Sequence, residues 1–311
     1  MKRVLAVYFS QTGQLERCAQ AVAGPLQAAG HAVDYLKLEP ATQYPFPWTF
    51  WAFFDAFPES VYLDPPPLKP WQAAAARYDL VLLCYSPWFL SPSPALTAFV
   101  QSQPGRALLQ GTPVVTLTAS RGMWTQAQEV VKQQLADAGA RHSDHIALDD
   151  PHKLSSFVTT PLWLLTGRQH PVASLPRAGV PDDLIAGSAR FGRALARALD
   201  AGTLDGCHPV LTGLCAAQVD PALMASEKIG RRSFRVWGKL VRAAGKPGDA
   251  ARRPVLAAYI AFLVLMIVTV VPLSLLLRTL LKPLMRARLA AQAASYEAPS
   301  GSGTERMREF A

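Results

Sequence analysis

The chain has 311 residues, 31 Lys and Arg against 22 Asp and Glu, and a formal net charge of +9 at pH 7. This length permits one large domain or two smaller ones. Residues 201–311 carry 15 Lys and Arg against 7 Asp and Glu, whereas residues 1–200 carry 16 against 15. The positive excess therefore belongs to the C-terminal third, where it flanks a long apolar segment, and this pattern argues against a nucleic-acid-binding protein.

The N-terminal strand leads directly into a turn with hydroxyl groups. An apolar run predicts a strand over residues 3–9, and a helical pattern extends over residues 15–29. The turn between them consists of Ser10, Gln11, Thr12, Gly13 and Gln14. Its N–H groups, its hydroxyls and the positive end of the helix would point at one anion, with room made by the glycine. The sequence predicts a site for a phosphate monoester or, alternatively, an ordinary turn in which a hydroxyl caps the helix.

Two later apolar runs also end in turns. The run over residues 79–85 predicts a strand followed by Ser86, Pro87, Trp88 and Phe89. The run over residues 113–118 predicts a strand followed by Ser120, Arg121, Gly122 and Trp124. Continuous apolar runs are typical of parallel strands buried on both faces, and the carboxyl ends of such strands meet at one crevice. The three turns therefore predict one shared site.

Strands and helices alternate along the first 200 residues. The predicted strands are 3–9, 32–38, 79–85, 113–118 and 144–149, and the predicted helices are 15–29, 94–103, 125–138 and 182–199. This alternation predicts an α/β fold with a five-stranded parallel sheet covered by helices on both faces, and five strands fit the doubly wound order 2-1-3-4-5.

The first turn resembles the phosphate loop of the flavodoxin-like family, whose usual form is Thr/Ser-x-Thr-Gly-x-Thr. It departs from that form at Leu15, where the family has a hydroxyl residue. The resemblance implies an FMN cofactor with its phosphate at residues 10–14 and its ring between residues 86–89 and residues 120–122. Arg121 would then stabilise negative charge near the flavin, or would be an ordinary surface arginine.

An aromatic-rich insertion separates the second and third predicted strands, over residues 44–62. It predicts a lid or an apolar substrate pocket, which would be lined by Trp48, Trp51, Phe54, Trp124 and Trp163. The alternatives are that these rings pack a helix on the sheet or contact a membrane.

Residues 1–200 also resemble a narrower group, the dialkylresorcinol condensing enzymes, whose role is usually taken as aromatase. The resemblance rests on four stretches: YFSQTGQ at 8–14, PFPWTFWAFFD at 45–55, PWFLSPS at 87–93 and TTPLW at 159–163. It implies flavin-dependent oxidation of a lipophilic cyclic dione, made by a ketosynthase, to a dialkylresorcinol. The expected partners are that substrate, a membrane and a ketosynthase of the same pathway, with assembly into a homo-oligomer left open.

Two other functions remain open. An NAD(P)H:quinone reductase would share the fold, FMN and the membrane, with NAD(P)H as a further cofactor; a non-catalytic membrane scaffold would keep the fold alone. The catalytic base is not assigned: Arg121 and His152 are the candidates in the site, and His152 stands ahead of the other histidines because it follows a predicted strand end. The cysteines at 18, 84, 207 and 215 show no metal-binding spacing, so no metal is expected.

The apolar segment Val255–Leu277 contains 23 residues without a charge, which is long enough for a transmembrane helix. The expected organisation is a flavodoxin-like domain over 1–200, a basic amphipathic linker over 201–253, a transmembrane helix over 254–281 and a basic, then disordered tail over 282–311. The larger upstream excess of cations predicts a protein of the cytoplasmic membrane with its catalytic domain facing the cytoplasm. A hairpin with both flanks in the cytoplasm is the alternative.

Overall fold

The computed structural model describes residues 1–152, 155–206, 208–269 and 287–310. Its centre is a five-stranded parallel sheet in the order β2-β1-β3-β6-β7. The strands are β1 (Arg3–Tyr8), β2 (Ala32–Lys37), β3 (Leu80–Tyr85), β6 (Pro113–Ser120) and β7 (Arg141–Asp149). Counted along the chain this order is 2-1-3-4-5, the flavodoxin-like arrangement, and the predicted fold class is confirmed.

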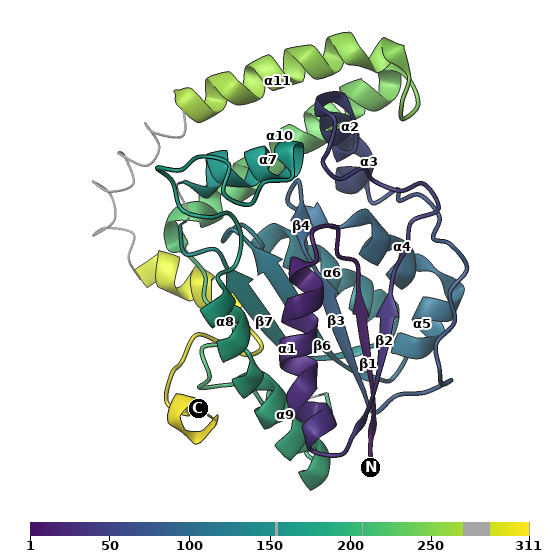
Figure 1. Cartoon of the computed structure of the whole chain (residues 1–311), viewed down its shortest axis with the longest axis vertical. Coiled ribbons are helices and arrows are strands. Elements are labelled where there is room, and N and C mark those ends of the chain that lie inside the picture. Colours follow the sequence, from purple (N-terminus) through teal and green to yellow (C-terminus); the bar gives the residue numbers. More distant parts are fainter. Residues whose placement is uncertain (153–154, 207, 270–286, 311) are drawn as a thin grey trace.

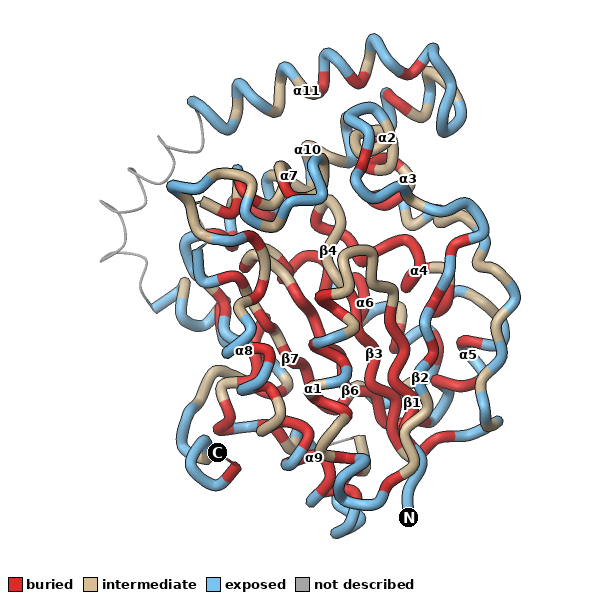
Figure 2. Tube along the Cα trace, in the orientation of Figure 1, coloured by how far each residue is buried: buried red, intermediate tan, exposed pale blue. Residues whose placement is uncertain are grey.

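Helices cover both faces of the sheet (Figure 1). One face carries α1 (Gln14–Ala28), α8 (Asp182–Gly187) and α9 (Ala189–Ala201), and the other carries α4 (Pro94–Gln101), α5 (Gln103–Leu109) and α6 (Thr125–Asp137). Side chains alternate along each strand, so Val4 and Ala6 belong to the first core while Leu5 and Val7 belong to the second. Figure 2 shows the central strands buried along their length, as the continuous apolar runs predict.

Two predicted helices are each divided in the structure. The helix expected over 94–103 ends at Gln101, because Ser102 is extended and its hydroxyl accepts a hydrogen bond from the Gly105 N–H at 3.1 Å, which starts α5. The helix expected over 182–199 is divided at Ser188 into α8 and α9.

Above the carboxyl ends of the strands lie the short elements of the insertion and the loops (Figure 1). They are α2 (Phe50–Asp55), α3 (Phe57–Tyr62), the hairpin of β4 (Pro87–Trp88) and β5 (Ser91–Pro92), and α7 (Ser156–Thr166). This is the edge of the sheet at which a doubly wound fold places its site.

The C-terminal third contains α10 (Pro221–Ala244), the 3₁₀ turn η1 (Ala250–Arg252), α11 (Arg253–Val268) and the 3₁₀ turn η2 (Met307–Phe310). The long helix α10 packs on α3 and α6, with Gly238 allowing close approach: a Cβ built there would lie 3.1 Å from the Tyr62 ring. At its other end, the buried carboxylate of Glu227 accepts hydrogen bonds from the Thr125 hydroxyl (2.8 Å) and the Gln126 N–H (3.2 Å). The segment expected to be a linker is therefore fixed to the domain.

The C-terminal segment differs from the expected disordered tail. A helical stretch covers residues 287–297, and the chain then returns to the edge of the sheet at β7. The buried Ser300 hydroxyl donates to Asp144 Oδ1 at 2.9 Å and accepts from the His145 N–H at 2.8 Å, and Phe310 enters the main core. Long-range contacts of this kind order a Ser- and Gly-rich stretch that composition alone assigns to disorder.

One helical stretch, Ala250–Val268, is long and apolar enough to cross a membrane, with a mean hydropathy of 1.8. Of the 18 most apolar consecutive residues in this stretch, only 17% are buried in the protein. The rest of the predicted transmembrane helix, from residue 270 to residue 281, lies outside the described residues.

Candidate functional site

The turn between β1 and α1 holds two hydroxyl groups against the start of the helix. The Ser10 hydroxyl accepts a hydrogen bond from the Glu16 N–H at 3.3 Å, and the Thr12 hydroxyl accepts one from the Gln14 N–H at 3.4 Å. Gly13 is left-handed, with φ of +79°, and no atom lies within 4 Å of a Cβ built there. The N-cap residue itself is Gly13, which makes no side-chain cap hydrogen bond, so the partly exposed space beside it at the positive end of the helix is open to an anion.

The two glutamines of the turn fasten it to other segments. The buried Gln14 amide donates to the Val180 carbonyl and accepts from the Val180 N–H, both at 3.1 Å. The Gln11 amide donates to the Pro45 carbonyl at 2.8 Å and accepts from Trp48 Nε1 at 2.9 Å. These two side chains fasten the turn to residues 45–48 and to Val180, so they position its backbone N–H groups and its hydroxyls.

Four aromatic rings form a cluster beside the turn. The Trp88 ring lies 6.1 Å from Phe9, 5.0 Å from Tyr44 and 5.4 Å from Trp48, measured between centroids, and all three pairs are edge-to-face. This aromatic cluster (Phe9, Tyr44, Trp48 and Trp88) joins the end of β1, the insertion and β4. Edge-to-face packing of this kind makes a firm apolar surface.

Trp88 stands in a hairpin with unusual backbone geometry. Pro87 pairs with Pro92 and Trp88 with Ser91, which leaves a two-residue turn of Phe89 and Leu90. Both turn residues have positive φ, 50° and 61°, where hairpins normally use Asn and Gly. Packing enforces the conformation, because the Phe89 ring lies 5.7 Å from Phe57 and 6.0 Å from Phe234. Such strain is typical of functional sites.

The third predicted turn is closed by its own hydrogen bonds. The Ser120 hydroxyl donates to Asp149 at 2.6 Å and accepts from the Gly122 N–H at 2.9 Å. The Arg121 guanidinium lies 4.5 Å from the centre of the Phe157 ring and donates to the Ser156 carbonyl at 3.4 Å. Burial lowers the pKa of Arg121 to about 10, against the opposing effect of Asp150. Arg121 is therefore a partly buried cation held against α7.

The residues predicted to line a substrate pocket are divided in the structure. Trp48 and Trp163 are both largely buried, at 5% and 8% exposure, and their segments are joined by a hydrogen bond from the Trp48 backbone N–H to the Leu164 carbonyl at 2.8 Å. On α2, Trp51 is 40% exposed, and the Phe54 ring turns toward Tyr259 of α11 at 6.5 Å.

Trp124 requires a correction. It is fully buried, donates to Asp149 at 3.2 Å through Nε1 and packs into a core cluster with Tyr296. A ring enclosed by the C-terminal segment cannot line a pocket with the others.

A cleft of about 340 Å³ lies beside the turn at residues 10–14, the phosphate-type turn. It is lined by His152 on one side and by Gly179, Val180 and Asp182 on the other. The exposed His152 is held through its N–H, which donates to the buried Asp150 at 2.8 Å, while Asp150 also accepts from the Gly179 N–H at 3.1 Å.

Two other histidines lie inside the protein. His142 and His145 share the Thr116 hydroxyl, at 3.0 and 2.9 Å. Burial lowers the pKa of both, to about 4 for His142. They are therefore neutral structural groups, and the His145 ring packs 4.7 Å from the buried Trp124 ring.

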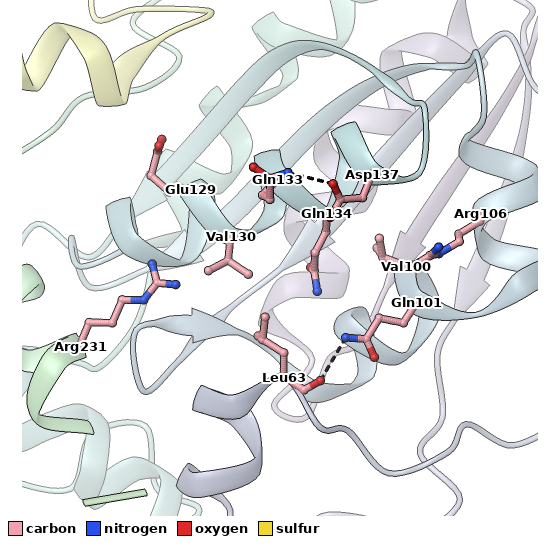
Figure 3. Close-up of a pocket in the computed structure, with 10 residues that line it drawn as sticks. All are labelled: Leu63, Val100, Gln101, Arg106, Glu129, Val130, Gln133, Gln134, Asp137 and Arg231. Atoms are coloured by element: carbon pink, nitrogen blue, oxygen red, sulfur yellow. Dashed lines mark hydrogen bonds between the residues drawn. The ribbon is translucent and has the colours of Figure 1, made fainter. Parts of the chain in front are cut away.

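A second cleft of about 340 Å³ lies away from all three turns (Figure 3). Polar side chains of α4, α5 and α6 line it together with Arg231 of α10. Figure 3 shows Gln133 bonded to Asp137 and Gln101 bonded to the Leu63 carbonyl. It contains none of the predicted site residues.

Sequence reasoning missed the groups that position the site. Asp149 orients Ser120 and Trp124, Asp150 holds the cleft, and Phe9 and Tyr44 complete the aromatic cluster. Their position in the sequence could have identified them. The two carboxylates and Phe9 stand at the carboxyl ends of predicted strands, where side chains enter the shared crevice.

No protein-family model matches the sequence, and no match was found among curated proteins. Similar solved structures include a flavodoxin from the domain Archaea, at 11% identity over 64% of this chain and 99% of that one, with a TM-score of 0.36. A flavoprotein from Lactobacillus acidophilus in complex with FMN has 16% identity over 47% and 91% of the two chains, with a TM-score of 0.36.

A flavodoxin from Megasphaera elsdenii has 18% identity over 62% and 98% of the two chains, with a TM-score of 0.32. At these sequence identities and TM-scores, the similarities support no conclusion about a ligand or a reaction. The fold assignment rests on the strand order of the chain itself, which is flavodoxin-like.

Proposed function

We propose that this protein is an FMN-dependent oxidoreductase that acts on a lipophilic ring substrate. The observation that carries the proposal is the direct connection between a phosphate-type turn and an aromatic cluster. Gln11 of the turn accepts a hydrogen bond from Trp48 of the cluster at 2.9 Å. A turn suited to an anion and an apolar aromatic cluster, held together at the carboxyl edge of a doubly wound sheet, would suit the two ends of a flavin mononucleotide.

Each part of the site has a role in this proposal. The hydroxyls of Ser10 and Thr12 and the N–H groups around Gly13 bind the phosphate, while Gln11 and Gln14 hold the turn in place. The segments Ser86–Phe89 and Ser120–Gly122 border the ring, and Trp88 offers it an aromatic surface. When bound, FMN supplies a hydride acceptor.

Arg121 and His152 are proposed for charge and proton handling. Arg121 keeps its positive charge at neutral pH, because its pKa stays near 10, and it would favour the negative charge of a reduced flavin. His152 lies at the mouth of the cleft beside the turn and is the proposed proton acceptor.

The specific reaction that we propose is oxidation of a cyclic dione, supplied by a ketosynthase, to a dialkylresorcinol at the cytoplasmic membrane. The aromatic insertion supports an apolar ring substrate, and the exposed apolar helix α11 supports a membrane location for a molecule with alkyl chains. Trp48 and Trp163 are the proposed substrate contacts, with Trp51 and Phe54 nearer to α11.

The test is flavin binding by the purified full chain. We expect added FMN to bind with a shifted visible spectrum, and Thr12→Val to weaken binding by about tenfold, as expected for loss of a bond to a charged group. Thr304→Val, at an exposed position far along the chain, is the matched control. Absence of FMN binding by the folded wild type would overturn the proposal.

Turnover distinguishes the two oxidoreductase functions. In a single turnover, we expect the FMN-loaded protein to convert one equivalent of an alkylated cyclohexane-1,3-dione to the resorcinol without NAD(P)H, while the two electrons removed reduce one equivalent of FMN. NAD(P)H oxidation that depends on an added quinone would instead assign a quinone reductase.

A further inference from the structure

The apolar segment that begins at α11 has both of its described flanks fastened to the same domain. We infer that it enters and leaves the lipid bilayer on one side, as a monotopic insertion, and that the edge of the sheet with the candidate site faces that bilayer. The inference concerns topology and does not depend on which cofactor is bound.

The first flank is fixed by a buried ion pair and by ring packing. The fully buried Arg252 guanidinium lies 3.1 Å from Asp55 and 3.1 Å from Glu59, so it joins the start of α11 to α2 and α3. About two helical turns further along, the Tyr259 ring lies 4.4 Å from Phe57. Breaking such a buried pair leaves an uncompensated charge, so this end of the helix cannot separate from the domain at low cost.

The second flank is fixed beside β7, an edge strand of the sheet. Ser300 and Asp144 form a buried hydrogen bond, and Glu297 accepts from the Val219 N–H at 2.9 Å. Phe310 is buried in the main core, and its carbonyl accepts from Arg193 Nε at 3.0 Å. These residues belong to the folded domain, so they lie on the same side of the membrane as the sheet.

The charge pattern agrees with this topology. Cations stand at both ends of the apolar segment, with Arg253 before it and Arg278, Lys282, Arg286 and Arg288 after it. Cations mark the cytoplasmic end of a membrane segment, so a single crossing would place one cationic flank on the unfavoured side. A segment that enters and leaves the bilayer on the same side places both cationic flanks among the anionic lipid head groups of that side.

The exposed part of α11 identifies lipid as the occupant. Val264, Leu265 and Val268 are 54%, 60% and 67% exposed, and only the beginning of the helix is covered by protein. Phe50 and Trp51 on the adjoining α2 are also exposed, and aromatic side chains of this kind favour the head-group level. Figure 1 shows α11 above α2 and α7, on the side of the sheet where the strands end.

Cysteine accessibility in membranes tests the topology. The parent is the full chain with Cys207→Ser and Cys215→Ser, which retains the buried Cys18 and Cys84. Ala243→Cys on α10 and Thr304→Cys near the C-terminus each add one exposed thiol. With a membrane-impermeant maleimide, we expect both variants to be labelled in inside-out vesicles and both to be protected in spheroplasts. Labelling of the two thiols from opposite sides would overturn the inference.

Vesicle binding tests the lipid contact separately. The purified full chain is sedimented with vesicles of phosphatidylglycerol and phosphatidylethanolamine. We expect Leu265→Glu to reduce the bound fraction by about tenfold, because a charge in the inserted face is costly. Leu184→Glu, at an exposed leucine of α8, should bind like the wild type. Equal binding by Leu265→Glu and the wild type, or no binding by the wild type, would show that α11 does not enter lipid.

Discussion

At the scale of single residues, Leu15 explains why one position of the phosphate-type turn departs from the family pattern. Its side chain is 3% exposed and lies in the core between α1 and the sheet, with Tyr8 and Cys18. The hydroxyls of Ser10 and Thr12 remain at the helix end, and Gly13 remains open. The departure therefore adds apolar burial at α1 and leaves the cradle in place.

Gly13 provides a prediction that separates backbone strain from ligand binding. Gly13→Ala should lower the free energy of unfolding by about 1 kcal/mol, because φ is +79° and an L residue is strained there. Gly202→Ala at the end of α9 is the matched control, since φ is +67° and space is equally open. Denaturant unfolding should give similar losses for both variants, whereas FMN titration should show weaker binding only for Gly13→Ala. Equal FMN affinity in the two variants would remove Gly13 from the site.

At the scale of elements, Glu227 fixes α10 to the first turn of α6. Its carboxylate is 1% exposed and accepts from Thr125 and Gln126, and burial raises its pKa to about 7. Below pH 4.5 the Glu227 carboxyl group is protonated in both the folded and the unfolded protein. As pH rises from 4.5 through 7, the unfolded protein loses this proton first, so the free energy of unfolding falls over this range. The attachment of α10 is therefore strongest in mild acid.

This attachment predicts a pH dependence of stability. Between pH 5 and pH 8, the wild type should lose about 2–3 kcal/mol more unfolding free energy than Glu227→Gln, because one pKa unit is worth about 1.4 kcal/mol. Asp144, whose pKa is raised to about 6, contributes equally to both proteins. Urea unfolding at a series of pH values measures the difference, and Glu129→Gln, at an exposed glutamate of α6, is the control. Parallel pH profiles for the wild type and Glu227→Gln would contradict the assignment.

The elements that the sequence predicts are those with local signals. The turn after β1 has its hydroxyls, its glycine and a helix start within five residues, and the five apolar runs mark the five strands of the sheet. The hairpin at Phe89 and Leu90 has no such signal, because bulky residues do not favour positive φ and contacts with Phe57 and Phe234 impose it. Trp124 was assigned to the pocket by its place after a strand, yet residues far along the chain enclose it.

At the scale of the whole molecule, the chain closes on itself at β7. The segment at residues 210–219 lies along this edge strand, where the Ala147 N–H donates to the Ala216 carbonyl at 2.7 Å, and residues 297–303 lie next to it. An uncovered edge strand exposes unpaired backbone groups, so these segments complete the sheet. Residues 1–200 therefore do not contain the whole folded unit. Ser300 and Asp144 are 156 positions apart, a separation that no local pattern reveals.

This closure predicts that one hydroxyl near the C-terminus stabilises the entire domain. Ser300→Ala would leave the buried Asp144 without one donor and the His145 N–H without its acceptor, so the free energy of unfolding should fall by about 1–3 kcal/mol. Thr304→Ala, four residues later and exposed, should change it by less than about 0.5 kcal/mol.

The measurement is denaturant unfolding followed by the far-ultraviolet signal of the sheet and helices. Because Phe310 and Ser300 belong to the same packed unit as β7, the loss should appear in the main cooperative transition and not in a separate early one. A small early transition, with the main one unmoved, would mean that the C-terminal segment folds on its own. Both flanks of the apolar segment would then no longer be bound to one body, and the same-side topology would lose its structural basis.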